Sequence, residues 1–275
     1  MQLSLLAGTP EIAATASTPT LLVGTPEAVA AEAKELGYDG IELLPGPPGT
    51  IGVAEVDLAL KSSDLVLTAV NSGRIAADGL TLLDPDPAIR NHTLNRLKDL
   101  LDFAANFGAP VLLAGAKGNL PDATSAQAVA ALAEEIFAGL ARFGARVGSS
   151  LLLAPTEEAE SNFVCSVAEA VAWVRRVGHP AFGLMLDTHE LARRESSVIE
   201  GLRAAAGLVQ HLHLYDPGRV PPGTRQEGSL DWPAIIVTLR EIGYEGAASV
   251  GLAGGDDRGT LALQTASYLR SLMAG

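Results

Sequence analysis

Three of the chain's five histidines accompany an aspartate in its last third. His189 follows Asp187 by two residues, and His211 and His213 are also two residues apart. Side chains two apart on a strand share a face, so each pair points one way if the chain is extended there. A carboxylate and several imidazoles can hold a divalent cation, or act as an acid/base pair near neutral pH. The alternative is that His211 and His213 only stabilise the interior, with their hydrogen bonds satisfied by neighbouring groups.

Other polar side chains also follow apolar runs, where strands are expected to end. These candidates are Glu42, Asn71, Lys117, Glu157 and Arg219. Glu42 either lines a site or bonds to its own loop. Lys117, in a Gly-rich loop, either meets a phosphate or carboxylate or is simply exposed. Arg219 either holds an anion in a bidentate fork or pairs only with Asp216.

Eight short apolar runs are expected to position these residues. They are Leu3–Leu6, Gly40–Leu44, Leu65–Val70, Pro110–Ala114, Ser150–Ala154, Phe182–Leu186, Val209–Leu214 and Gly246–Val250. Most are nearly continuous in Val, Leu and Ile, which is typical of parallel strands that are covered on both faces.

Helical segments with start and stop signals separate these runs. Thr25-Pro26-Glu27 predicts a helix start, and Gly37 predicts its end. Asp86-Pro87 and Gly108 bound a second helix in the same way. Further helices are expected over residues 125–143, 168–177, 199–206, 232–242 and 261–273.

Eight strand–helix units in about 250 residues predict an α/β fold, a single (β/α)₈ TIM-barrel domain over residues 1–275. An open doubly wound sheet is the alternative. It is disfavoured because Leu6-Ala7-Gly8-Thr9-Pro10 stands where a Gly-x-Gly-x-x-Gly loop would follow the first strand. In a TIM barrel the active site lies at the carboxyl ends of the strands, where the candidate residues are.

Composition excludes several classes of protein. The net charge of −13 disfavours a nucleic-acid partner, and a single cysteine excludes an intramolecular disulfide. No apolar run reaches the ~18 residues of a membrane span. We therefore expect a cytoplasmic protein with a small-molecule partner and no membrane partner, and the sequence is compatible with a homo-oligomer.

Four motifs carry a resemblance to a known family. They are residues 36–43 (LGYDGIEL), 186–189 (LDTH), 211–216 (HLHLYD) with 219–223 (RVPPG), and 242–246 (IGYEG). In this order and at these strand positions they resemble the sugar phosphate isomerase/epimerase family of xylose isomerase-like TIM barrels, which includes ketohexose 3-epimerases. The motifs span nearly the whole chain.

This resemblance implies a divalent metal (Mn, Mg or Co) held by four groups at the ends of strands five to eight. Asp187 and His213 match two of them. Ala154 and Gly251 stand where the family has two glutamates, which also move the proton in the epimerases. We therefore expect an incomplete metal site with weak or absent occupancy. Rescue by a loop carboxylate is the alternative, from Glu157 or Glu158 after strand five and from Asp256 or Asp257 after strand eight.

The resemblance favours a sugar, sugar phosphate or polyol isomerase or epimerase that transfers a proton next to a carbonyl. His189, His211 and Glu157 are the expected catalytic residues. Glu42, Asn71, Lys117 and Arg219 are the expected substrate-binding residues. Because the two glutamates are missing, we expect a less acidic mouth that suits an anionic polyol. The main alternative is a metal-free, inactive homologue that binds a sugar-like ligand or a partner. A zinc endonuclease is disfavoured because it needs more metal ligands and a basic groove.

Overall fold

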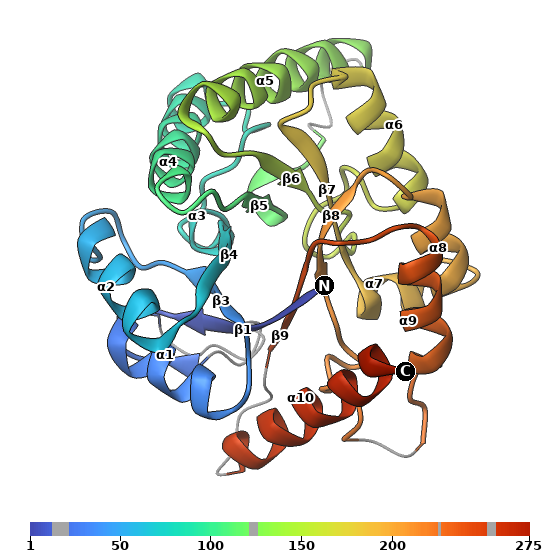
Figure 1. The fold of residues 1–275 in the computed structure, drawn as a ribbon. Helices are drawn as coiled ribbons and strands as arrows, with labels where there is room; N and C mark the ends of the chain where they lie inside the picture. Colours follow the sequence, from blue (N-terminus) through green and yellow to red (C-terminus); the bar gives the residue numbers. More distant parts are fainter. Residues whose placement is uncertain (13–21, 121–125, 225–226, 252–256) are drawn as a thin grey trace. The chain divides into compact units, whose positions relative to one another are not determined.

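A computed structural model describes residues 1–12, 22–120, 126–224, 227–251 and 257–275. Contacts divide the chain into two compact units. The first comprises Met1–Thr68 and Leu186–Gly275, and the second comprises Ala69–Met185. Strands and helices alternate along the chain (Figure 1).

The first unit contains a parallel sheet that carries most of the candidate residues. Its strands are β1 (Gln2–Gly8), β2 (Leu22–Val23), β3 (Gly40–Leu44), β8 (Val209–His213) and β9 (Ala247–Val250). β1 pairs with β2, β3 and β9, and β9 pairs with β8. In this register Ser4 lies opposite both Gly40 and Ser249. The short strand β2 was not predicted from the sequence.

The second unit continues the same pattern. β5 (Val111–Leu113) and β6 (Leu151–Leu153) pair in parallel with each other, β4 (Val66–Asn71) pairs with β5, and β7 (Phe182–Asp187) pairs with β6. β4 and β7 cross the sequence boundaries between the units. All eight predicted strands are therefore present near their expected bounds.

The start and stop signals predicted for the helices at Thr25 and Asp86 are confirmed by local capping. The Thr25 side chain accepts a hydrogen bond from the Ala28 amide, and Asp86 does the same for Ala88. Gly37 and Gly108 follow these two helices with positive φ, which glycine adopts without steric cost. The helices are α1 (Pro26–Glu35), α2 (Val53–Ser63), α3 (Gly73–Ala77), α4 (Pro87–Ala105), α5 (Ala126–Val147), α6 (Val167–Val177), α7 (Thr188–Arg194), α8 (Val198–Ala204), α9 (Trp232–Glu241) and α10 (Arg258–Ala274), with a 3₁₀ turn at Gly115–Lys117.

Three helices, α2, α3 and α7, were not predicted. α2 begins after Gly52, which has no side chain to cap the helix, so the usual start signal is missing. The expected start of α5 at Ser125 lies outside the described residues. Among the described residues, no helix combines the length and hydrophobicity that crossing a membrane requires.

Candidate active site

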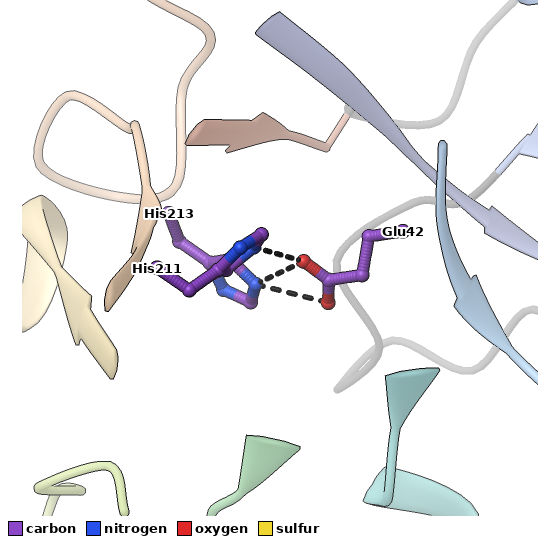
Figure 2. A group of neighbouring side chains, drawn as sticks. All are labelled: Glu42, His211 and His213. Atoms are coloured by element: carbon purple, nitrogen blue, oxygen red, sulfur yellow. Dashed lines mark hydrogen bonds and ion pairs between the residues drawn. The ribbon is translucent and has the colours of Figure 1, made fainter. Parts of the chain in front are cut away.

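Glu42 on β3 faces two neighbouring histidines of β8, His211 and His213 (Figure 2). The His211 Nε2 atom is 2.9 Å from Glu42 Oε2, and the His213 Nε2 atom is 2.8 Å from the same oxygen and 3.0 Å from Oε1. Glu42 and His211 are fully buried, and His213 is nearly so. A carboxylate only accepts hydrogen bonds, so both imidazoles donate to it.

Two serines complete this buried network. The Ser249 hydroxyl lies 2.9 Å from His211 Nε2 and 2.8 Å from the Ser4 hydroxyl. Both serines lie on strands adjacent in the sheet, opposite one another in register. Neither serine was predicted to belong to the site, although their spacing on the strands places them on the same face as the histidines.

The pKa values of the two histidines shift in opposite directions. Burial alone would raise the pKa of Glu42, but its contacts with His213 and His211 hold that pKa well below its usual range. Burial lowers the pKa of His211 and outweighs the effect of Glu42. Burial also opposes the charged form of His213, but Glu42 and then Asp187 raise its pKa overall. These directions favour a Glu42 carboxylate paired with a charged His213, next to a neutral His211.

Asp187 ends β7 and caps α7. Its Oδ1 accepts the His189 amide at 2.8 Å, so the chain turns into a helix at Thr188. The condition for Asp187 and His189 to share a face, an extended chain through His189, is therefore not met, because the aspartate side chain stabilises a helix start instead. His189 is buried, and its Nδ1 accepts the Gly218 amide at 3.1 Å. This tautomer carries its proton on Nε2.

Arg219 contacts two carboxylates at this helix. Its Nη1 donates to Asp187 Oδ2 at 2.9 Å, and its Nη2 donates to Glu190 Oε1 at 3.0 Å. The alternative that Arg219 pairs with Asp216 is wrong. The expected anion site is not supported either, because two carboxylates already offset the guanidinium charge. Glu190 was not among the predicted site residues, although it directly follows His189.

Asp216 has a different role, because it holds the loop that carries Arg219. Its carboxylate is fully buried and accepts hydrogen bonds from the Ser229 hydroxyl, the Leu230 amide at 2.7 Å and the Trp232 indole at 3.0 Å. Its backbone also pairs with Val220, so residues 216–220 form a tight turn. Asp216 thereby fixes both ends of the loop around Arg219.

We expect the Asp216→Asn substitution to lower the free energy of unfolding by about 1 kcal/mol, because hydrogen bonds to a charged acceptor are stronger than those to a neutral one. Urea denaturation followed by circular dichroism measures this change. Asp57→Asn is the matched control, since Asp57 is half-exposed and pairs with Lys61 on the same helix. Equal effects of the two substitutions would contradict the structural role of Asp216.

The remaining candidates belong to the second unit. Lys117 is fully buried rather than exposed, and it donates to the Thr156 hydroxyl. The Asn71 side chain accepts the Gly73 amide at 2.8 Å. Glu157 is half-buried, and its backbone carbonyl accepts the Ser161 amide at 3.0 Å. Ala154 lies in an apolar cluster with Leu152, Met185 and neighbouring residues.

The comparison with protein families decides the fold. The model of the xylose isomerase-like TIM barrel matches residues 30–272. The chain belongs to this family. The prediction of a TIM barrel is confirmed, and the open doubly wound sheet is excluded.

Relatives with assigned names are sugar epimerases. The chain is 28% identical over 225 residues to the L-ribulose 3-epimerase of Mesorhizobium japonicum, covering 79% of this chain and 72% of that protein. It is 33% identical over 109 residues to the D-psicose 3-epimerase of Agrobacterium fabrum, a match that covers 40% of this chain and 37% of the relative.

Solved structures share the fold along almost the whole chain. A structure of L-ribulose 3-epimerase aligns with a TM-score of 0.80 at 19% identity, over 98% of this chain and 94% of that one. The 3-keto-D-glucoside 4-epimerase of E. coli aligns with a TM-score of 0.78 at 20% identity, over 98% and 99%.

The family's four-group metal site does not fit this chain. Asp187 Oδ2 and His213 Nδ1 lie 3.9 Å apart, but Arg219 contacts the same aspartate oxygen. Ala154 stands in an apolar cluster. A Cβ added at Gly251 would overlap the Tyr215 hydroxyl, so the Tyr215 ring fills the position of the other glutamate side chain.

Two further groups bear on metal binding. Glu42, His211 and His213 offer ligand atoms within 4.8 Å of one another and could hold a cation. However, these atoms already bond to each other, and the imidazole nitrogens must lose their protons before they bind a metal. Two carboxylates after β9 were the alternative ligands. Asp256 lies outside the described residues, and Asp257 immediately precedes α10.

Proposed function

We propose that this protein is a sugar epimerase or isomerase that transfers a proton next to a carbonyl without a tightly bound divalent metal. The observation that carries the proposal is a connected set of charged side chains in the first unit. Glu42 contacts His213, His213 Nδ1 faces Asp187 at 3.9 Å, and Arg219 joins Asp187 to Glu190. Perturbed, mutually paired titratable groups of this kind are typical of active sites. The family membership supports the reaction type.

The reaction needs a base, an acid and stabilisation of negative charge. A base removes the proton from the carbon next to the carbonyl, the electron pair moves toward the carbonyl oxygen, and an enediol(ate) forms. Return of a proton to the opposite face gives the epimer, and return to the neighbouring carbon gives the isomer. Within the first unit we assign proton donation toward the oxygen to His189, whose proton is on Nε2. Donation of the His189 proton also stabilises the negative charge that develops on this oxygen. Glu157, which belongs to the second unit, stays the base that the sequence predicts.

The charge balance favours an uncharged sugar or polyol. Glu42, Asp187 and Glu190 contribute three carboxylates, set against Arg219, the charged His213 and Arg194, which approaches Glu190 at 3.9 Å. A phosphate or carboxylate on the substrate would therefore meet cations whose charge carboxylates already offset. Two of the relatives are named as 3-epimerases of L-ribulose and of D-psicose.

Proton exchange with solvent tests this function directly. We expect the protein to introduce deuterium at C3 of D-psicose or L-ribulose in D₂O, as followed by NMR. His189→Gln and Glu157→Gln should each slow exchange by about 10²–10⁴-fold, the usual contribution of an acid or base. His92→Gln and Glu241→Gln are matched controls, because both side chains are exposed.

The apolar surroundings of Ala154 favour a second candidate, a sugar-binding homologue without turnover. Calorimetry distinguishes the two. Saturable binding of a ketose with no deuterium incorporation by the unmodified protein would reject the enzyme proposal in favour of this alternative. Exchange that is unaffected by both active-site substitutions would reject the residue assignments.

A further inference from the structure

Arg219 is held in an unusual backbone conformation. Its φ is +57°, in the left-handed region that non-glycine residues adopt at a cost, and it follows Gly218 in the turn between Asp216 and Val220. The Gly218 amide donates to His189, which ties this turn to α7. A strained residue persists only where its surroundings hold it, and such residues concentrate at functional sites. The loop therefore fixes the place of the Arg219 side chain.

The Arg219 guanidinium lies against Asp187, one of the two side chains that match family metal ligands. Asp187 Oδ2 faces His213 Nδ1, and these two side chains match family metal ligands. The guanidinium donates to this same Oδ2 at 2.9 Å and to Glu190 at 3.0 Å. One positive charge thus lies against two carboxylates, of which Asp187 matches a family metal ligand. Both carboxylates are more than nine-tenths buried, so neither is well compensated by water.

We infer that Arg219 replaces the divalent cation of the family and thereby keeps this site metal-free. The inference concerns the same site and rests on the proposed function for its catalytic meaning. The Arg219 guanidinium competes with a metal ion for Asp187 and Glu190, and this competition does not depend on catalytic turnover. Without Arg219, these two buried carboxylates would lose the cation that contacts both of them, next to the His213 imidazole. Carboxylate oxygens with an imidazole nitrogen are donors suited to Mn²⁺ and similar ions.

Removing Arg219 should therefore create metal affinity. Loss of the free Mn²⁺ signal in electron paramagnetic resonance measures binding by metal-stripped protein. We expect Arg219→Ala to bind Mn²⁺ at least about tenfold more tightly than the unmodified protein, a change of the size that neighbouring residues impose on metal sites. Arg219→Lys, which retains the positive charge, should not gain this affinity. Arg194→Ala is the matched control, because Arg194 approaches Glu190 at 3.9 Å but is on the opposite oxygen from Arg219.

Further variants locate any bound ion. Adding Asp187→Asn to Arg219→Ala should abolish the gained affinity. Gained binding that survives this second substitution but is lost with His211→Gln would place the ion at the Glu42 group and overturn the inference. Tight Mn²⁺ binding by the unmodified protein would also overturn it, as would the absence of any gain in a folded Arg219→Ala.

If circular dichroism shows that Arg219→Ala does not fold, Arg219→Gln removes the charge with less loss of packing and is read in the same way. The inference is also separable from the proposed function. If the protein shows no deuterium exchange but gives the expected Mn²⁺ results, only the proposed enzyme function is rejected. If it shows exchange but the Mn²⁺ results are contrary, only the inference that Arg219 replaces the metal is rejected.

Discussion

The Glu42→Gln substitution is expected to lower the free energy of unfolding by about 3–5 kcal/mol, the cost of removing one partner from a buried ion pair. Glutamine has the same shape, so the loss is electrostatic rather than a cavity. The buried His213 would lose the carboxylate that favours its charged form. The glutamine would also put an amide NH₂ donor in place of one of the two carboxylate oxygens that face His213 Nε2. Urea denaturation followed by circular dichroism measures the change.

A double substitution separates this effect from general damage. The protein with both Glu42→Gln and His213→Gln should lose less stability than the sum of the two single losses. The double variant leaves no buried charge without its partner, whereas each single variant does. Glu241→Gln is the matched control, since its half-exposed pair with Arg203 should contribute no more than about 1 kcal/mol. A loss below about 1 kcal/mol in Glu42→Gln would show that Glu42 and His213 do not form an ion pair in the folded protein.

The strands were predictable because their signal is local and redundant. The run Leu151–Leu153 is apolar on both faces and is followed by the proline at 155, so sequence alone defines it. α1 was predictable for the same reason, from Thr25, Pro26 and the left-handed Gly37. α7 was missed because Asp187 serves two purposes, as the last residue of a strand and as the cap of a helix.

The site was predictable in residue types but not in partners. The spacing of His211 and His213 indicates a shared face, and the structure confirms that both meet Glu42. The partners of Arg219 depend on a long side chain leaving a turn with positive φ, which no sequence spacing encodes. Lys117 was expected at the surface or at a ligand because charged residues are seldom fully buried, and its contact with Thr156 links two separate loops.

Gly251→Ala is the second substitution with a large expected effect, a loss of about 3 kcal/mol in the free energy of unfolding. The new methyl group would overlap the Tyr215 hydroxyl and lie 3.1 Å from the ring carbon that bears it. Tyr215 is almost fully buried and packs edge-on against His213, so its ring cannot simply swing away. Gly251 is not among the described glycines with positive φ, so the loss would come from overpacking rather than backbone strain.

The companion change Tyr215→Phe tests this explanation. Phenylalanine removes the overlapping oxygen and leaves a tight carbon contact that a shift of a few tenths of an ångström relieves. We therefore expect Tyr215→Phe with Gly251→Ala to recover most of the stability lost in Gly251→Ala, whereas additive losses would indicate another cause. A loss under about 0.5 kcal/mol in Gly251→Ala alone would mean that Tyr215 yields easily. Position 251 would then accept a glutamate, and the argument that Tyr215 prevents completion of the family's metal site would fail.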